Sequence, residues 1–275
     1  MAHVALVTGG SSGIGRATAL ALHARGTTVY AAARGVDRMA DLERRGINVL
    51  ALDVTDDDSL RAAVGTVLAE QSRIDVLVNS AGYGAFGSIE ETPLDVAREQ
   101  FQVNLFGLAR LTQLVLPTMR AQGSGRIVNI SSLAGLFASP LGGWYSASKF
   151  ALEAMSDSLR VEVVQFGIDV VLVEPGPVRT AWHARADVGL RHVSSSGPYA
   201  ALARGVSKVI TGFDDESITS DAEDVAAVVV TAATADRPRP RYLVGRGAHL
   251  AVAFRRILPD RAWDRAVLRR HATAG

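Results

Sequence analysis

Short apolar runs alternate along the chain with longer segments whose apolar residues recur at helical spacing. Uninterrupted apolar runs are typical of strands buried on both faces, and the helices between them supply right-handed crossovers between parallel strands. The pattern therefore predicts a single α/β domain over residues 1–275, with a doubly wound parallel sheet of about seven strands and helices on both faces. The predicted strands are residues 3–8, 27–33, 47–52, 74–79, 126–131, 168–173 and 242–244.

The composition indicates in which cellular compartment this domain works and which kinds of partner it binds. The chain contains no cysteine, which excludes disulfides and thiolate chemistry and makes a reducing cytoplasm the expected location. Its apolar runs stay below the roughly 18 residues that a membrane-spanning helix needs, so we expect no integral membrane segment. The net charge of +1 is unevenly distributed, because ten arginines and three aspartates lie between Asp236 and the end. That basic tail fits an anionic partner or, more simply, a solvated helix face, and we expect no nucleic-acid partner.

Three residues supply the side chains needed to act on a carbonyl group. Tyr145 and Lys149 are four residues apart on a predicted helix over 145–166, so they share one face. Ser132 follows the predicted strand 126–131 and can fold back toward them. A hydroxyl, a phenol and an ammonium around one cavity suit polarising a carbonyl and protonating its oxygen. The plainer alternative is an exposed helix lysine beside a half-buried tyrosine.

The scarcity of lysine strengthens this interpretation. Lys149 and Lys208 are the only lysines against 27 arginines, so a lysine at position 149 suggests a role that arginine cannot fill. We expect the Lys149 ammonium to lower the pKa of Tyr145 from about 10 to about 7, which requires roughly 4 kcal/mol. One ammonium about 4 Å away supplies that amount at an effective dielectric constant near 20.

A glycine-rich turn joins the first predicted strand to the first predicted helix. Gly9 permits the tight turn, Gly13 lets the backbone approach a pyrophosphate, and Gly15 allows the helix to pack closely on the strand. The helix start then presents free amides and a positive dipole end to phosphate, as in dinucleotide-binding Rossmann folds. The candidate cofactor residues here are Gly9, Ser11, Ser12, Gly13, Ile14 and Gly15.

The end of the second strand indicates which cofactor binds. An acidic residue there binds the ribose 2′-hydroxyl of NAD, whereas an arginine accommodates the 2′-phosphate of NADP. The chain has Ala33 and then Arg34 at this place, which favours NADP(H) over NAD(H). Arg38 is a second candidate phosphate ligand, while nearby Asp37 supports NAD(H). The plainer reading of Arg34 is an ordinary surface charge.

With these residues in place, the chain resembles the short-chain dehydrogenase/reductase family over essentially its whole length. Within that family it looks like the branch containing 17β-hydroxysteroid and retinol dehydrogenases. The matching motifs are Thr8-Gly9-x-x-x-Gly13-Ile14-Gly15, Asp53-Val54, Asn79-Ser80-Ala81-Gly82, Asn104, Ser132, Tyr145-x-x-x-Lys149 and Pro175-Gly176.

The resemblance assigns further roles to residues after several strands. It implies that Asp53 contacts the adenine and that Asn104 holds a water in a proton relay through Lys149 and the ribose. A plainer role stays open for each residue. Asp53 could act as a helix cap, and Asn104 could be an amide inside a helix that hydrogen-bonds to backbone. The cofactor contacts implied by the resemblance are Asp53, Val54, Asn79, Ala81, Gly82, Tyr145, Lys149, Pro175, Gly176, Val178 and Thr180.

The expected activity is NADP(H)-dependent interconversion of a ketone or aldehyde and an alcohol. Ser132 would orient the carbonyl and Tyr145 would donate the proton. The branch resemblance and the apolar residues near the site, such as Leu133, Phe137 and Trp144, imply an apolar small molecule that is steroid-, retinoid- or long-chain-like. We expect no metal, and we expect a homodimer or homotetramer.

Two other functions stay open, and a membrane-surface protein is a third, weaker alternative that rests on the basic tail. A 3-oxoacyl-thioester reductase of lipid or polyketide synthesis would need a basic entrance, for which Arg179, Arg185 and Arg191 are candidates. A non-catalytic NADP-binding sensor would share the fold, but it would not need Asn104 together with the serine, tyrosine and lysine.

Two segments depart from the regular alternation. Residues 178–220 are rich in Ser, Gly and Arg, with helical character only near 200–210, and we expect a substrate loop there. We expect its part 180–212, which has few core signals, to order over the site when cofactor and substrate bind. Residues 248–275 form a basic helical arm, which we expect to pack on the body or on a neighbouring subunit rather than on lipid. Its apolar stripe before Pro259 is Leu250, Ala253, Phe254, Ile257 and Leu258.

Overall fold

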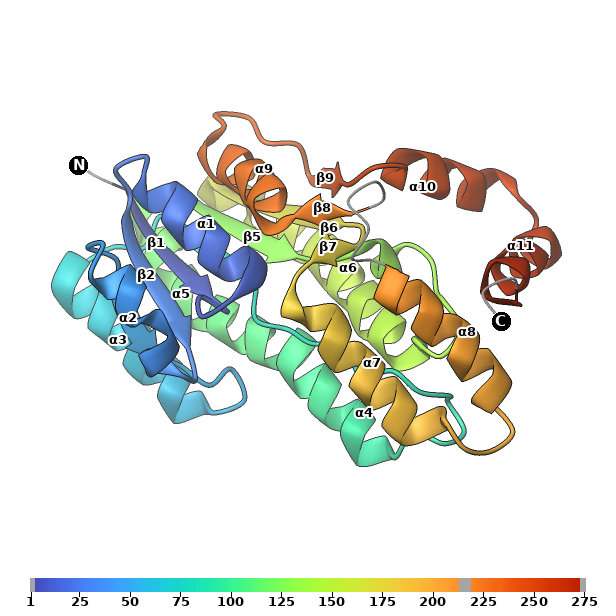
Figure 1. Cartoon of the computed structure of the whole chain (residues 1–275). Coiled ribbons are helices and arrows are strands. Elements are labelled where there is room, and N and C mark those ends of the chain that lie inside the picture. The colour runs from blue at the N-terminus through green and yellow to red at the C-terminus, as the bar shows by residue number, and fades with distance from the viewer. Residues whose placement is uncertain (1–2, 213–218, 273–275) are drawn as a thin grey trace.

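The computed structural model describes residues 3–212 and 219–272, and these form the doubly wound α/β fold expected from the sequence. Within this part of the chain, seven strands pair in parallel in the order β3-β2-β1-β4-β5-β6-β9 (Figure 1). The order reverses between β1 and β4, and ligands of such sheets bind at that point, outside the carboxyl ends of the strands. The strands are β1 (Val4–Thr8), β2 (Thr28–Ala33), β3 (Asn48–Ala51), β4 (Val76–Asn79), β5 (Gly125–Ile130), β6 (Ile168–Pro175) and β9 (Arg241–Val244).

Helices cover both faces of the sheet because the central strands are apolar on both sides. Val7 belongs to the core under α1, α2 and α9, while its neighbour Leu6 belongs to the core under α3, α5 and α6. Both side chains are fully buried. The helices are α1 (Gly13–His23), α2 (Ala40–Glu43), α3 (Asp57–Gln71), α4 (Leu94–Phe101), α5 (Leu108–Gln122), α6 (Gly143–Val163) and α9 (Ala222–Thr234).

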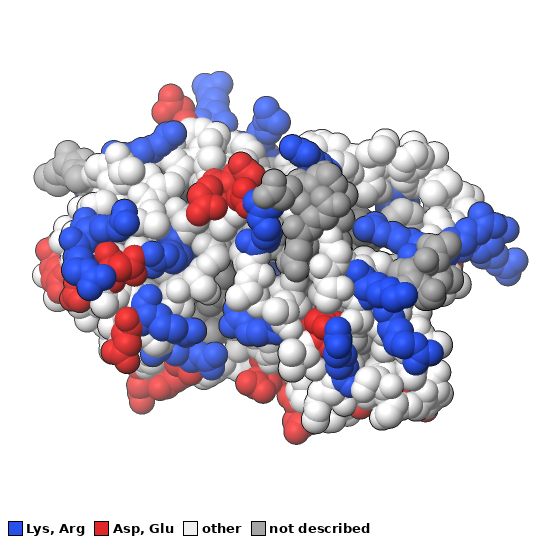
Figure 2. Space-filling model, in the orientation of Figure 1, with Lys and Arg blue, Asp and Glu red and all other residues white. Residues whose placement is uncertain are grey.

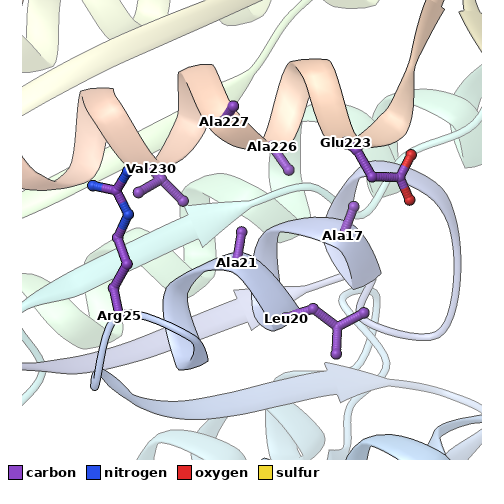
Figure 3. Close-up of a pocket in the computed structure, with 8 residues that line it drawn as sticks. All are labelled: Ala17, Leu20, Ala21, Arg25, Glu223, Ala226, Ala227 and Val230. Atoms are coloured by element: carbon purple, nitrogen blue, oxygen red, sulfur yellow. The ribbon is translucent and has the colours of Figure 1, made fainter.

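A surface groove of about 360 Å³ lies between α1 and α9 (Figure 3). Half of the residues that line it are alanines, which let the two helices run close together, and Arg25 and Glu223 lie toward its two ends. Among the described residues that line it, none is a serine, tyrosine or lysine. The groove therefore follows from the close packing of two helices and lacks the groups that carbonyl chemistry needs.

The segment expected to be irregular is largely helical, so that expectation is wrong. It forms β7 (Val178–Arg179), α7 (Ala181–Ser194), α8 (Ala200–Thr211) and β8 (Ser220–Asp221), and β7 pairs with β8. Ala186 and Leu190 of α7 are buried, as are Val206 and Ile210 of α8. The helical character expected near 200–210 is confirmed by α8, whereas residues 213–218 lie outside the described part of the chain.

The C-terminal arm consists of α10 (Ala248–Ile257) and α11 (Asp260–Ala272), which meet at Pro259. α11 packs against α8, whereas α10 turns Ala248 and Val252 inward. Leu250, Phe254 and Ile257 of α10 are exposed, so the stripe that was expected to pack faces away from the described body. Among the residues described, no helix is both long and apolar enough to cross a membrane.

Candidate active site

The carboxyl ends of β1 and β4 are tied together by one side chain. The Thr8 hydroxyl accepts hydrogen bonds from the backbone amides of Ser80 and Ala81, each at 3.0 Å. Asn79, at the end of β4, donates to Asn129 of β5 at 2.9 Å and to Thr112 of α5 at 3.3 Å. Asn79 and Ala81 thus hold the sheet and the adjoining loop in place.

The glycine turn has the geometry of a phosphate cradle. Gly9 and Gly13 adopt positive φ angles of 71° and 52°, a region that favours glycine. A Cβ on Gly15 would lie 2.5 Å from the carbonyl oxygen of Gly9, so only glycine allows α1 to approach the turn. α1 begins at Gly13, between exposed Ser12 and half-buried Ile14, and the first-turn amides of a helix can bind an anion. These residues, with half-buried Ser11, fit a dinucleotide pyrophosphate.

Basic side chains surround the end of β2, where the adenosine ribose of such a cofactor would lie. Arg34 is exposed, and its positive charge acts to lower the pKa of both Asp53 and Tyr83, so it lies near both side chains. The Arg38 guanidinium lies against Gly35, where an added Cβ would be 2.9 Å from its Nε. Two guanidiniums, those of Arg34 and Arg38, therefore lie in the turn that follows β2.

Asp53 uses its carboxylate within its own turn. It accepts hydrogen bonds from the Thr55 amide at 2.9 Å and from the Thr55 hydroxyl at 2.8 Å. Val54 is buried, and its carbonyl oxygen would be 2.1 Å from a Cβ on Gly107, at the start of α5. The adenine contact implied for Asp53 stays a prediction, since its carboxylate oxygen Oδ1 already stabilises the turn.

The structure brings Ser132, Tyr145 and Lys149 into one buried cluster. Tyr145 and Lys149, one turn apart on α6, are 9% and 7% exposed. The Lys149 ammonium donates to the Ile130 carbonyl at 2.8 Å, at the end of β5. The Ser132 hydroxyl oxygen accepts from the Ala134 amide at 3.1 Å, and the hydroxyl also hydrogen-bonds to the Tyr145 phenol. The end of β5 and the start of α6 therefore bring these three side chains together, as their positions in the sequence predicted.

Burial sets the protonation of this cluster. It raises the pKa of Tyr145 to about 12, against the opposing effect of the Ser132 hydrogen bond. It also lowers the pKa of Lys149 to about 8, against the opposing effect of the Glu153 carboxylate. The expectation that the tyrosine pKa falls toward 7 is therefore wrong for this structure, because desolvation of the phenolate dominates. Tyr145 is a protonated phenol at neutral pH, which is the form that can donate a proton.

Asn104 connects the loop after β4 to α6. It lies in a π-helical turn, Gln102–Gly107, between α4 and α5, and such turns often occur at functional sites. Its side-chain amide accepts from the Tyr83 amide at 3.1 Å and donates to the Tyr83 carbonyl at 2.9 Å and to Ser148 at 3.1 Å. A Cβ on Gly82 would lie 3.1 Å from Asn104 and 3.9 Å from the Lys149 ammonium. Asn104 thus fixes the loop over Lys149, and its role in a water relay stays a prediction.

Aromatic rings cover the Tyr145 phenol. Trp182 of α7 lies 5.2 Å from the Tyr145 ring, and Phe86 lies 5.9 Å from it, between ring centroids. Gly84 lets Trp182 approach, because a Cβ there would be 2.5 Å from the indole. Sequence reasoning missed Trp182, although its four-residue spacing from Ala186 and Leu190 would have indicated a buried helix face. These rings make one wall of the site apolar.

The start of the α7 segment reaches back to the glycine turn. Thr180 caps α7 by accepting a hydrogen bond from the Trp182 amide at 3.3 Å, and its methyl group would lie 3.3 Å from a Cβ on Gly13. Gly176, after Pro175 of β6, donates its amide to the Val244 carbonyl of β9 at 2.8 Å. Val178 is buried in β7. These implied cofactor contacts thus join the strand end to the helices over the site.

A buried acidic cluster lies behind Lys149, and sequence reasoning missed it. Glu153 follows Lys149 by one turn of α6, and Glu174 comes from β6; both carboxyls are buried. Arg241 of β9 contacts Glu153 and Glu174, each at 3.1 Å, and Asp157 at 2.7 Å. Burial and the neighbouring Glu153 charge raise the pKa of Glu174 to about 7, and burial raises the pKa of Glu153. The four-residue spacing of Glu153 from Lys149 was the available signal.

The fold and this site define an oxidoreductase that binds a nicotinamide dinucleotide, and comparison with known proteins identifies the family. A family model described as short chain dehydrogenase matches residues 3–189. The chain is 33% identical over 273 residues to the NADPH-dependent 3-dehydrocapnine reductase of Ornithobacterium rhinotracheale, covering 95% of this chain and 94% of that protein. A short-chain dehydrogenase structure from Streptomyces avermitilis matches with a TM-score of 0.82 and 36% identity over 93% of both chains. The chain belongs to the short-chain dehydrogenase/reductase family.

The branch indicated by the sequence motifs is also represented among the relatives. The chain is 34% identical over 262 residues to estradiol 17-beta-dehydrogenase 1 of Rattus norvegicus, covering 87% of this chain and 72% of that protein. The resemblance stated from the motifs is therefore confirmed, and the chain is a short-chain dehydrogenase/reductase enzyme.

Proposed function

We propose that the protein is an NADP(H)-dependent oxidoreductase that interconverts a ketone or aldehyde and an alcohol on an apolar, steroid-, retinoid- or long-chain-like substrate. The observation that carries the proposal is the buried Tyr145 phenol, which has Ser132 and Lys149 beside it and Trp182 over its ring. A general acid for carbonyl reduction has to be protonated, shielded from water and next to a second hydrogen-bond donor.

Ser132, Tyr145 and Lys149 have different roles in the proposed reaction. The carbonyl oxygen lies between the Ser132 and Tyr145 hydroxyls, which polarise the bond by donating hydrogen bonds to it. A reduced nicotinamide cofactor, held by the glycine turn between β1 and α1, would supply the hydride to the carbonyl carbon. Tyr145 gives its proton to the oxygen as negative charge develops there, and the Lys149 ammonium stabilises the phenolate that remains. Oxidation of the alcohol uses the same groups in reverse.

The cofactor proposed is NADP(H) rather than NAD(H). Arg34 and Arg38 at the end of β2 support this choice, because guanidiniums bind a phosphate bidentately. Asp37 is exposed in the same turn, and no side chain of β2 places a carboxylate at the strand end. A relative that covers nearly the whole chain is named as NADPH-dependent, which adds support.

The apolar wall formed by Phe86, Leu141 and Trp182 supports the proposed substrate class. The 3-oxoacyl-thioester alternative has less support than the sequence suggested. Arg179 is ion-paired with Asp221, and Arg191 is ion-paired with Asp187 at 2.8 Å, so two of the three arginines expected at a basic entrance are engaged within the chain.

The proposed oligomeric state and cellular location rest on exposed apolar residues and on composition. Phe106, Phe150 and Val161 are exposed on the outer sides of the π-helical turn and α6, and such a surface supports a homodimer or homotetramer. The absence of cysteine from the sequence supports a cytoplasmic location.

The test is a panel of ketones, aldehydes and alcohols of graded bulk, assayed with NADPH, NADH and their oxidised forms by absorbance of the reduced nicotinamide. We expect turnover of apolar carbonyl compounds with NADPH, and loss of turnover with retained cofactor binding in Tyr145→Phe. Turnover in Tyr145→Phe at the wild-type rate, or failure of the purified enzyme to bind NADPH, would refute the proposal.

A further inference from the structure

Helix α10 exposes an apolar face that the described body leaves uncovered. Leu250, Phe254 and Ile257 are 61%, 50% and 77% exposed, and their spacings of four and three residues place them on one side of the helix. Ala248 and Val252 occupy the opposite side and are buried. An apolar side chain so exposed on a single position would be ordinary, but three in a continuous row mark a contact surface.

The charged side chains of α10 itself are all basic, and Asp260, just after its end, is paired with Arg255. α10 contains two arginines, a histidine and no acidic residue. Arg256 and His249 lie along one border of the apolar row, and exposed Arg246 and Arg261 lie beyond its two ends. In Figure 2 the surface over α10 is largely uncoloured, and blue side chains lie near its ends and around α11. Apolar residues bordered by arginines are the pattern of helices that lie in the interface of an anionic membrane.

The arm also connects this face to the site. Trp263 of α11 packs on Phe137, in the loop after Ser132, with ring centroids 5.3 Å apart. Arg255, on the last turn of α10, lies 5.8 Å from the Trp263 ring and pairs with Asp260 at 3.0 Å. α11 packs on α8, where Gly205 allows the closest approach, since a Cβ there would be 2.1 Å from the His271 carbonyl. The exposed row is thus held by a chain of contacts beside the helices that cover the site.

We propose that α10 docks on an anionic lipid surface, with Leu250, Phe254 and Ile257 among the acyl chains and the neighbouring arginines at the headgroups. A second copy of the chain is a poorer partner, because a two-fold contact would place the same basic borders against each other. The docking does not rest on the proposed reaction. It would place the substrate-covering helices next to the bilayer, from which an apolar substrate can enter.

The experiment is vesicle flotation with the full-length protein. Vesicles of phosphatidylcholine alone are compared with vesicles that also contain phosphatidylglycerol, at low and at high salt. We expect wild-type protein to float with the anionic vesicles, with binding reduced at high salt because the arginine attraction is screened. The double variant Phe254→Ser/Ile257→Ser should bind at least about tenfold more weakly, since two large apolar side chains no longer enter the bilayer.

Matched variants separate the arm from general surface effects. Val164→Ser removes an aliphatic side chain that is 63% exposed just after α6, and it should bind vesicles like wild type. Arg256→Gln should weaken binding to anionic vesicles, whereas Arg44→Gln at the end of α2 should not. All variants should keep the wild-type melting temperature and NADPH affinity, because none of these side chains belongs to the cluster around Tyr145.

Two results would overturn the proposal. One is wild-type protein that stays with neither kind of vesicle, or a double variant that binds as well as wild type. The other is a lower mass by light scattering for the double variant than for wild type, when neither protein binds vesicles. That result would assign the apolar row to a contact between subunits. If the wild-type protein binds vesicles but does not reduce a water-soluble ketone, that result counts against the proposed reaction and leaves the docking proposal standing.

Discussion

The pH dependence of carbonyl reduction should be set by Lys149 and, through it, by Glu153. Burial lowers the pKa of Lys149 to about 8, and the Glu153 carboxylate one turn away opposes that shift. The protonated form of Lys149 is the useful one, so activity should be full below pH 8 and should fall as the pH rises through the pKa. The charged fraction then decreases about tenfold for each further pH unit. Tyr145 adds no break in this range, because burial raises its pKa to about 12.

Replacing Glu153 by glutamine should move this basic limb to lower pH. Two unit charges about 6 Å apart, the Cβ spacing of helix residues one turn apart, interact by about 3 kcal/mol at an effective dielectric constant of 20. That value corresponds to about two pH units and is an upper limit, because Arg241 already offsets part of the carboxylate charge. We expect a shift of about one unit, which would make kcat/KM about fivefold lower than wild type at pH 8 and nearly equal at pH 6.

The assay is kcat/KM for a reactive ketone at saturating NADPH, measured from pH 6 to pH 10 in constant ionic strength. Glu174→Gln is the matched control, since it removes a carboxyl from the same cluster while leaving the Glu153 charge next to Lys149. Its basic limb should stay near that of wild type. The reasoning is wrong if the limb of Glu153→Gln does not move or moves to higher pH. Equal shifts in both variants would show that general loosening of the cluster, rather than the Glu153 charge, controls Lys149.

The remaining predictions concern the cofactor, the lysine and the two outer segments. Arg34→Ala should lower kcat/KM with NADPH by about 10- to 100-fold and leave NADH nearly unchanged, as expected for one lost charge-assisted phosphate contact; equal losses with both cofactors would contradict this. Lys149→Arg should lose at least about tenfold in kcat/KM and weaken NADPH binding, because a planar guanidinium misplaces the ribose; a near-wild-type rate would mean that charge alone matters. Gly205→Val should detach α11, since its side chain meets the His271 carbonyl, and limited proteolysis should then release the arm; an intact arm would show that α11 is held elsewhere. Truncation after Gly247 should likewise lower the melting temperature by uncovering α8. Hydrogen exchange in α7 should slow when cofactor and substrate bind; equal exchange in the free and ternary states would mean that these helices do not move.

The sequence was informative where local pattern and global fold agree. The first strand is apolar from Val4 to Val7 and is followed closely by the glycine turn, so both the parallel sheet and its cofactor edge could be predicted. The spacing of Tyr145 and Lys149 fixes their common face on α6 whatever surrounds them. Ser132 could be added because parallel strands end on the same edge of the sheet.

The parts that could not be predicted depend on contacts between distant segments. The apolar residues of α7 that pack inward include small ones such as Ala186, and their burial depends on the facing residues of α8. Burial raises the pKa of Tyr145, and the rings that contact its phenol, Trp182 and Phe86, come from two other segments. Periodicity identified the apolar row on α10 but said nothing of what covers it. The arm packs on the body through α11 and the inner side of α10, whereas the row itself is exposed, and its packing on a neighbouring subunit stays a prediction.

One face of α6 shows how the site carries so many charges without water. Tyr145, Lys149, Glu153 and Asp157 follow each other at intervals of four residues, so they form a slowly winding row along the helix. A lysine buried alone would lose its proton, and a carboxylate buried alone would gain one. In this row the Lys149 ammonium has Glu153 below it, and Arg241 contacts Glu153 and Asp157. Positive and negative groups thus alternate from the buried phenol toward the half-exposed end. The position one turn after Tyr145 can hold an ammonium because the next turn holds a carboxylate, and the carboxylate is retained because β9 supplies a guanidinium.

The proton-donating end of α6 therefore depends on a strand at the edge of the sheet. Arg241→Met should impair the site although it leaves every group around the substrate carbonyl unchanged. We expect it to raise the pKa of Glu153 further, remove the charge that supports Lys149 and shift the basic limb of kcat/KM in the same direction as Glu153→Gln. A wild-type pH profile in Arg241→Met would show that the row is stabilised by the helix alone.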